Sequence, residues 1–193
     1  MIGRNNKMGE MVLQSRFQDH VNSNSLWKEG DLLLLACSGG VDSVVLATLL
    51  QRMHQHVEIL HCNFNLRGEE SKRDEDFVRS LAQSMGLPCQ VQSFDTKAAV
   101  LTMGKGVQEV ARMLRYEWFD TVIEARQKQH KHVYLLTAHH ADDQAETIAM
   151  NFFRGTGMAG MHGMQLKAGN LIRPLLFAKR AEILDFAESN DIA

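Results

Sequence analysis

The stretch Asp31-Leu-Leu-Leu-Leu-Ala-Cys37, followed by Ser38-Gly-Gly-Val-Asp-Ser43, decides the fold of this chain. A short, unbroken apolar run is typical of a strand that is covered on both faces. Two glycines let the backbone turn sharply after such a strand, and the apolar periodicity of residues 44–53 indicates a helix behind them. The sequence therefore predicts a strand, a glycine turn and a helix as its first unit.

Apolar runs of strand length recur along the chain and alternate with segments of helical periodicity. Further strands are predicted at 57–64, 89–94, 132–138 and 171–176, and helices at 69–85, 106–129, 141–153 and 179–189. This alternation predicts an α/β fold with a mostly parallel, Rossmann-like sheet and helices on both faces. The ligands of such sheets bind beyond the carboxyl ends of the strands.

Length and composition are those of one ordinary domain. The chain has 193 residues, of which 45% are hydrophobic and 23% charged, so we expect residues 1–193 to form a single domain. Residues 95–105 and 154–170 lack clear periodicity and are predicted to be loops near a site. Cys37, Cys62 and Cys89 form no C-x-x-C pair, and buried thiols are the favoured interpretation.

Charge and hydropathy limit the location and the partners. No apolar run reaches the length of a bilayer span, and the first ten residues lack the apolar centre of a signal peptide. We therefore expect a cytoplasmic protein with no membrane partner. The net charge of −2 gives no overall attraction to nucleic acid, so an RNA partner must be held by local clusters of Arg and Lys.

The segment Ser38-Gly-Gly-Val-Asp-Ser43 has the features of an anion-binding loop. It presents backbone N–H groups at a helix N-terminus, and Ser38 and Ser43 add hydroxyl groups. No Lys follows the glycines, so the loop is not of the G-x-x-x-x-G-K-[ST] type. Asp42 beside a polyphosphate would be repelled unless it held a cation such as Mg²⁺. The alternative is a plain strand-to-helix turn capped by Ser or Asp.

These six residues also resemble the S-G-G-x-D-S loop of the N-type ATP pyrophosphatases, or PP-loop proteins, whose fold is that of adenine nucleotide alpha hydrolases. The resemblance implies that ATP is cleaved between its α- and β-phosphates. It implies nucleotide binding by Ser38, Gly39, Gly40, Val41, Asp42 and Ser43. The superfamily includes GMP, NAD and asparagine synthetases, RNA thiolases and tRNA(Ile)-lysidine synthetases, and the loop alone does not choose among them.

Two further segments resemble lysidine synthetases. His61-Cys-Asn-Phe-Asn-Leu-Arg-Gly68 resembles H-x-N-H-x-L-R-G, with Phe64 in the place of the second His and Asn65 after it, and implies a nucleotide-binding role for His61. In the predicted helix 106–129, Arg112 and Arg115 lie in a segment that resembles E-x-A-R-x-x-R-Y-x-F, with Trp118 in the place of the Phe. The two arginines share one face, where two guanidiniums can clamp phosphate. The alternative for this helix is a solvated charge pattern.

The segment His139-His-Ala-Asp-Asp-Gln-Ala-Glu146 admits two interpretations. Asp142 and Glu146 share a helical face and His140 precedes them, which supports a metal-dependent hydrolase as a runner-up. The same segment, continued to Arg154 and Gly157, resembles the lysidine synthetase motif A-H-H-x-D-D-Q-x-E-T…R-G-x-G. Arg173-Pro-Leu-Leu176 then resembles the R-P-L-L strand of that family.

The resemblance covers residues 32–185 and identifies the chain with the N-terminal domain of the tRNA(Ile)-lysidine synthetase family. It implies a ligase that uses ATP to adenylate the wobble cytidine of isoleucine tRNA and then joins free lysine to it. A tRNA thiolase is the alternative on this fold, but we expect that enzyme to carry paired cysteines. The C-terminal tRNA-binding domains of the family are expected to be absent, so tRNA should bind weakly. A homodimer remains open.

The implied roles fall on a small set of residues. The catalytic candidates are Asp42, His140, Asp143 and Arg112. The Mg²⁺ candidates are Asp42 and Asp142, and the candidates for contact with tRNA or phosphate are Arg112, Arg115 and Arg154. Either His140 or a nearby carboxylate takes the proton from the lysine amine, and the sequence leaves that choice open.

Overall fold

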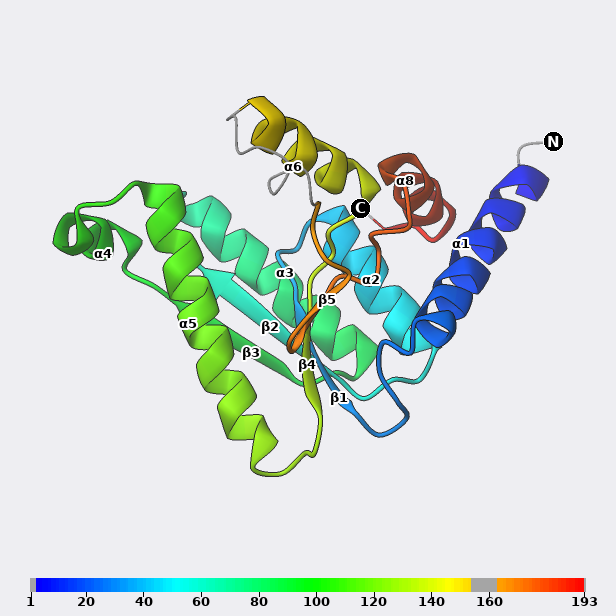
Figure 1. Ribbon diagram of the computed structural model, residues 1–193, viewed down its shortest axis with the longest axis horizontal. Helices are drawn as coiled ribbons and strands as arrows, with labels where there is room; N and C mark the ends of the chain where they lie inside the picture. The colour runs from blue at the N-terminus through cyan, green and yellow to red at the C-terminus, as the bar shows by residue number, and fades with distance from the viewer. Residues whose placement is uncertain (1–2, 154–162, 193) are drawn as a thin grey trace. The chain divides into compact units, whose positions relative to one another are not determined.

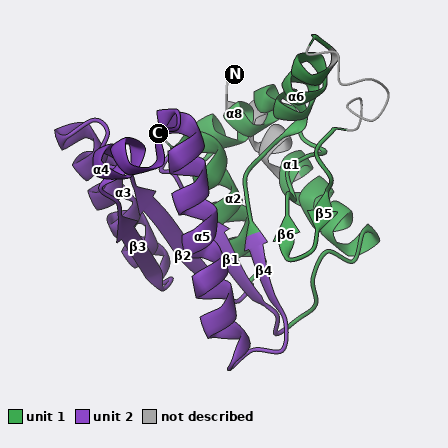
Figure 2. Cartoon of the chain, turned by 60° about the vertical axis from the view of Figure 1, so that its left-hand side comes forward, with its two compact units in different colours: residues 1–29, 40–55, 136–193 green, residues 30–39, 56–135 purple. Residues whose placement is uncertain are grey.

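The computed structural model describes residues 3–153 and 163–192. Its residues group into two compact units, coloured separately in Figure 2. Unit 1 consists of residues 1–29, 40–55 and 136–193, and unit 2 of residues 30–39 and 56–135. The expectation of one domain stays a prediction.

The sheet of unit 2 follows the predicted alternation. Its strands are β1 (Leu32–Ala36), β2 (Val57–Asn63), β3 (Cys89–Ser93) and β4 (Val133–Leu136), in the order β3-β2-β1-β4. β1 pairs parallel to β2 with Leu33 opposite Val57, and β2 pairs parallel to β3 with Ile59 opposite Cys89. The first four leucines of β1 are buried, as expected of a strand covered on both faces.

Helices cover both faces of these strands. α3 (Glu69–Met85) and α5 (Val107–Gln127) lie on opposite faces (Figures 1 and 2). Right-handed connections explain this, because β1, β2 and β3 advance in one direction across the sheet, whereas α5 returns the chain to β4 on the other side of β1. The predicted α/β class with a mostly parallel sheet is therefore confirmed.

The predicted loop at 95–105 is wrong, because α4 (Thr96–Met103) occupies most of it. The side chain of Asp95 caps this helix by accepting a hydrogen bond from the Ala98 N–H at 3.0 Å. Gly104, with φ of 63°, closes its carboxyl end. A helix of two turns is too short for its apolar periodicity to be recognised in the sequence, but the capping residues at both ends can be recognised.

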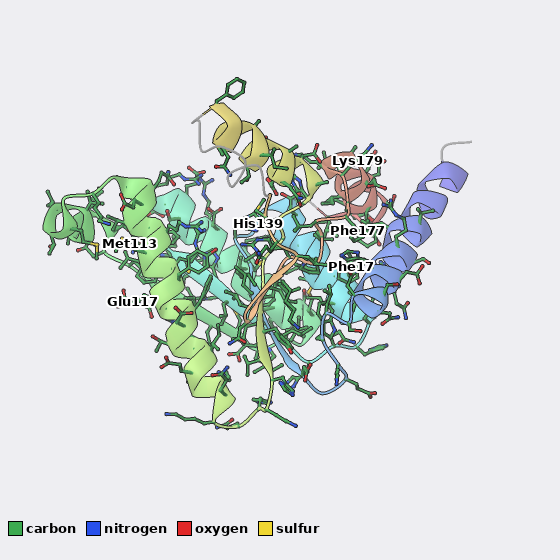
Figure 3. The ribbon with its side chains drawn as sticks, in the orientation of Figure 1. Phe17, Met113, Glu117, His139, Phe177 and Lys179 are labelled. Atoms are coloured by element: carbon green, nitrogen blue, oxygen red, sulfur yellow. The ribbon has the colours of Figure 1, made fainter. Side chains whose placement is uncertain are left out.

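Unit 1 consists mainly of helices. They are α1 (Gly3–Ser23), α2 (Val41–Arg52), α6 (Ala141–Phe153) and α8 (Arg180–Ser189), with a short antiparallel hairpin of β5 (Lys167–Ala168) and β6 (Leu171–Ile172). α8 packs against α1 and α2, with Phe17 and Phe186 fully buried. Figure 3 labels Phe17 and, beside α1, Phe177, whose ring centroid lies 4.7 Å from that of His20.

The strand predicted at 171–176 is shorter than expected. Only Leu171–Ile172 pairs, and a turn follows, in which the Leu176 N–H donates to the Arg173 carbonyl at 3.2 Å. Pro174 has no N–H to contribute to a ladder, which explains the early end of the strand. Residues 154–162, the larger part of the predicted loop at 154–170, lie outside the described residues.

The cysteine prediction holds for one of three thiols. Cys37 is buried, whereas Cys62 and Cys89 are only partly buried because they lie on β2 and at the start of β3 near the edge of the sheet. Burial nevertheless raises the pKa of Cys62 to about 12. Within residues 3–153 and 163–192, no helix combines the length and the apolar character needed to cross a bilayer.

Candidate functional site

Three helices of unit 1 bring their N-terminal ends together around Asp42. Asp42 lies in the first turn of α2, His140 directly precedes α6, and Arg180 opens α8. His140 Nε2 is 3.9 Å from Asp42 Oδ1, and Arg180 Nη1 is 3.5 Å from Asp42 Oδ2. With Asp142 and Asp143 of α6, these residues form what we name the helix-terminus cluster.

His140 and Asp143 cap α6 reciprocally. The backbone N–H of His140 donates to Asp143 Oδ2 at 2.9 Å, and the N–H of Asp143 donates to His140 Nδ1 at 3.4 Å. With Nδ1 in this contact, Nε2 is the nitrogen that faces Asp42. The side chain of His140 is only 3% exposed, so the ring orientation is set by packing as well as by the cap.

Asp142 joins α6 to α8. Its Oδ2 accepts a hydrogen bond from the backbone N–H of Arg180 at 2.8 Å and lies 3.7 Å from His140 Nδ1. The Ala141 N–H also donates to the carbonyl of Ala178 at 2.9 Å. Asp142 therefore has a capping role in α8 in addition to the predicted role at a cation, and its half-exposed carboxylate retains further lone pairs.

Asp42 has the features of a cation ligand. Among the described residues its Oδ1 atom is buried without a hydrogen-bond partner. A buried carboxylate oxygen in that state favours a bound cation, and Mg²⁺ prefers oxygen ligands. No group of three or more His, Cys, Asp or Glu side chains in the described parts of the chain is arranged to hold a metal. A Mg²⁺ ion is commonly bound by one or two carboxylates together with water and substrate oxygens.

The predicted anion-binding loop leads into the cluster. Gly40 is the N-cap residue of α2 and makes no side-chain cap, so the helix end is open to an anion. The Ser43 hydroxyl donates to the Gly40 carbonyl at 2.8 Å, so in this structure it stabilises the turn. Ser38 is exposed, and Val41 and Asp42 are partly exposed.

The arrangement of His61 in unit 2 is explained by packing. The ring is buried, and its Nδ1 lies 2.9 Å from the carbonyl oxygen of Cys37. Because a carbonyl only accepts, Nδ1 carries the proton and donates, which ties β2 to the residue after β1. The nucleotide-binding role of His61 stays a prediction.

Two predicted segments meet at Arg115. Its guanidinium carbon lies 5.2 Å from the ring centroid of Phe64, which belongs to the 61–68 segment and stacks on Phe94 at 5.4 Å. Arg112 lies over Tyr116, 4.9 Å from its ring centroid. Both arginines are exposed on α5, where Figure 3 labels Met113 and Glu117 of the same helix. Arg154 lies outside the described residues.

Comparison with known proteins gives the family. A family model described as the PP-loop domain matches residues 10–193. The chain belongs to the PP-loop domain family. The match to a PP-loop domain supports the use of ATP. The N-terminus of α2, which has no side-chain cap, agrees with this.

The curated relatives of this PP-loop domain are longer than the chain. It is 36% identical over 183 residues to a tRNA(Ile)-lysidine synthase from Chlorobaculum tepidum, covering 93% of this chain and 54% of the relative. It is 38% identical over 177 residues to a tRNA(Ile)-lysidine synthase from Bacteroides thetaiotaomicron, covering 92% of this chain and 41% of the relative. The chain thus spans about half or less of these relatives, and it is similar to their PP-loop portion.

Solved structures confirm the fold of the PP-loop domain. A U34-tRNA thiolase from Methanococcus maripaludis, solved with its 4Fe-4S cluster, superposes with a TM-score of 0.73 at 18% identity, over 95% of this chain and 66% of the other. An NH₃-dependent NAD synthetase from Campylobacter jejuni gives a TM-score of 0.61 at 12% identity, over 97% of this chain and 74% of the other. At these identities the likeness shows the fold alone.

The structure of the PP-loop domain adds residues that the sequence did not reveal. Arg180 was within a predicted helix, but its pairing with Asp42 depends on how α8 packs on α2. Asn63, at the end of β2, donates to Glu75 of α3 at 2.9 Å and accepts from the Asn65 N–H at 2.9 Å. Asn65 has φ of 51°, a conformation that Asn tolerates, and its amide donates to Phe94 O at 3.0 Å, so its side chain holds the loop.

Proposed function

We propose that this PP-loop domain is the ATP-handling part of a tRNA(Ile)-lysidine synthase. The observation that carries the proposal is its similarity to enzymes of that name, at 36% and 38% identity over more than nine tenths of the chain. The motifs that resemble the family provide Asp42, His140, Asp142 and Asp143 of the helix-terminus cluster, which supports the same function.

The proposed reaction has two steps. The carbon-2 oxygen of the wobble cytidine in isoleucine tRNA attacks the α-phosphate of ATP, and the bond to the β-phosphate breaks to release pyrophosphate. The neutral side-chain amine of free lysine then attacks carbon 2, and AMP leaves with the oxygen. Activation must come first, because the oxygen of cytidine alone is a poor leaving group.

Different residues of this chain are proposed to bind the phosphates, to hold Mg²⁺ and to accept the proton. Backbone N–H groups at the N-terminus of α2 would bind the phosphates, as helix N-termini bind anions. Asp42 and Asp142 would hold Mg²⁺, which supplies neutralisation of phosphate charge when bound. His140 and Asp143 are the candidates for the proton of the lysine amine.

Arg112, Arg115 and Arg154 are proposed to contact phosphate or RNA. The exposure of Arg112 and Arg115 on one face of α5 supports this for two of them. A cytoplasmic location is a further prediction of the proposal, which leaves open whether the protein forms a homodimer.

The test is an assay of the modified nucleoside. Purified protein is incubated with ATP, Mg²⁺, lysine and a transcript of isoleucine tRNA, and the nucleosides are analysed by mass spectrometry. We expect one cytidine to gain the mass of lysine less one water, with AMP and pyrophosphate formed in equal amounts. The matched control is a transcript whose wobble cytidine is replaced by uridine, which should gain nothing.

The alternatives predict different products. Incorporation of sulfur from a sulfur donor in place of lysine would establish a thiolase, and cleavage of the RNA with metal but without ATP would establish a hydrolase. Either result, with no lysine adduct, would overturn the proposal.

A further inference from the structure

Arg180 occupies a position that the family motifs do not assign. It is the first residue of α8, and its guanidinium lies 3.5 Å from the carboxylate of Asp42, in the anion-binding turn of α2. Figure 3 labels its neighbour Lys179 at the start of the helix. The side chain of Arg180 is 53% exposed, so a dissolved phosphate can reach it.

The backbone around Arg180 is fixed without help from its side chain. Its N–H donates to Asp142 Oδ2 at 2.8 Å, and the N–H of Lys179 donates to Glu182 Oε2 at 2.8 Å. The Ala178 carbonyl accepts from Ala141 at 2.9 Å. These bonds hold the start of α8 against α6, so a substitution that changes only the guanidinium leaves its position intact.

The distance between the Arg180 guanidinium and the Asp42 carboxylate indicates that the guanidinium is suited to binding a phosphate. A charge-assisted hydrogen bond between a guanidinium and a carboxylate is about 2.7–2.9 Å long, whereas this pair is 3.5 Å apart. Asp42 therefore orients Arg180 by charge without a tight hydrogen bond. The planar fork retains donors that match the oxygens of a phosphate.

The negative charge of the helix-terminus cluster favours a positively charged group beside it. Asp42, Asp142 and Asp143 carry three carboxylates that lie 3.5–3.9 Å from the ring nitrogens of His140 and would repel a triphosphate bound beside them. A guanidinium at the same place offsets part of that repulsion, in addition to any cation held by the carboxylates.

We propose that Arg180 binds the β- and γ-phosphates of ATP, and the pyrophosphate that leaves, from the position in which Asp42 holds it. This inference rests on the ATP use in the proposed function and specifies a residue for it. Arg180 would thereby discriminate ATP and pyrophosphate from AMP, which lacks these phosphates.

Arg16 is the matched control. It also pairs with a carboxylate of α8, because it hydrogen-bonds to Glu182, and its side chain is 43% exposed. Its guanidinium lies over the ring of Phe177, 5.2 Å from the centroid, and none of its contacts involves the helix-terminus cluster.

The experiment measures the binding of ATP, pyrophosphate and AMP, each with Mg²⁺, by isothermal titration calorimetry. The proteins are wild type, Arg180→Gln, Arg180→Lys and Arg16→Gln, and circular dichroism verifies their folding. We expect Arg180→Gln to weaken ATP and pyrophosphate binding by about 10- to 100-fold, the range for a charged hydrogen bond. AMP binding should change by less than about twofold, Arg180→Lys should be intermediate, and Arg16→Gln should match wild type.

Three results would overturn the inference. One is unchanged ATP affinity in Arg180→Gln, and another is an equal loss for ATP and AMP. The third is a loss of ATP affinity in Arg16→Gln as large as that in Arg180→Gln. The proposed function fails separately, if the wild-type protein binds ATP but forms no lysine adduct. If the wild type transfers lysine and Arg180→Gln binds ATP normally, only the role of Arg180 is removed.

Discussion

Two adjacent glycines in the loop at 38–43 meet different physical demands. Gly39 has φ of 89°, which L side chains rarely adopt, and a β-carbon there would lie 3.4 Å from Val78 Cγ2. Gly40 has φ of −74° and ψ of 157° and is exposed, so its backbone accommodates any residue. At Gly39 the requirement is conformational, whereas at Gly40 the proposed requirement is the close approach of a phosphate to the backbone.

Substitution at these glycines should therefore separate binding from stability. We predict that Gly40→Val abolishes ATP binding, because the branched side chain blocks the N–H groups, while the melting temperature stays near that of wild type. Gly39→Ala should lower the free energy of unfolding by about 1–3 kcal/mol. Calorimetry and thermal melts measure both effects. A folded Gly40→Val protein with wild-type affinity for ATP would disprove the role of this loop.

Asp42 should matter more for turnover than for affinity. We predict that Asp42→Asn in the intact protein lowers the rate of lysine transfer by about 100-fold or more, the size of effect seen when one electrostatic group is removed from an active site. The change in ATP affinity should be smaller, because the loop N–H groups remain. The control is Asp19→Asn on α1, an exposed carboxylate outside the cluster. Activity within a few-fold of wild type would exclude a metal role for Asp42.

At the scale of elements, one buried ion pair fixes α5 on β2. Arg126 of α5 donates to both oxygens of Glu58 at 2.8 Å, and Gln90 of β3 also donates to this carboxylate. Burial raises the pKa of Glu58, but the hydrogen bonds from Arg126 and Gln90 lower it by more, so the pKa lies below its ordinary range. The helix that carries Arg112 and Arg115 is thus positioned by a pair at its other end.

Removing one partner should weaken this attachment. We predict that Arg126→Ala lowers the free energy of unfolding by about 1.5–3 kcal/mol, the range for hydrogen bonds to charged groups, since Glu58 is then buried without its partner. Urea unfolding at neutral pH measures the change. The exposed pair Lys105 with Glu109 provides the control, because Lys105→Ala should change the free energy by less than about 1 kcal/mol. Equal losses from both substitutions would contradict this.

The same pair has a defined pH dependence. Because the pKa of Glu58 is lower in the folded than in the unfolded protein, its stabilisation is present above the ordinary glutamate pKa, about 4.5, and is lost as the pH falls through the lowered folded pKa. The difference in unfolding free energy between wild type and Glu58→Gln should therefore be constant from pH 7 to about pH 5 and narrow below that. A difference that narrows near pH 6 would show that another group titrates instead.

At the scale of the whole molecule, charge limits how this chain holds tRNA. The chain has 21 Lys and Arg residues against 23 Asp and Glu, for a net charge of −2. Tight binding to a nucleic-acid backbone takes several basic contacts, and affinity falls steeply with salt when those contacts supply most of the energy. The local pair Arg112 with Arg115 provides only part of such a surface.

We therefore predict that residues 1–193 bind ATP but hold tRNA weakly and without strong preference for isoleucine tRNA. Gel-shift titrations at two salt concentrations, with a second tRNA as competitor, measure this. With two to three phosphate contacts, the slope of log affinity against log salt should be about −2 to −3. Tight binding that selects isoleucine tRNA would place the recognition surface within this chain.

The sequence by itself determined the features that depend on neighbouring residues. The alternation of strands and helices, the turn after β1 and the amphipathic α5 are visible because periodicity, glycine and caps are local properties. α4 was missed since two turns give too little periodicity, although Asp95 and Gly104 mark its ends. The motifs indicated the family, because they combine particular residue types at fixed spacing.

Only the tertiary structure decided which side chains meet. The pairing of Arg180 with Asp42, the buried Oδ1 of Asp42 and the position of His140 Nε2 beside it follow from the packing of α8, α2 and α6, which lie far apart in the chain. Likewise, the bond of Asn63 to Glu75 follows from the position of α3 beside β2. Such contacts depend on through-space distances of a few ångströms, and no local pattern in one sequence encodes these distances.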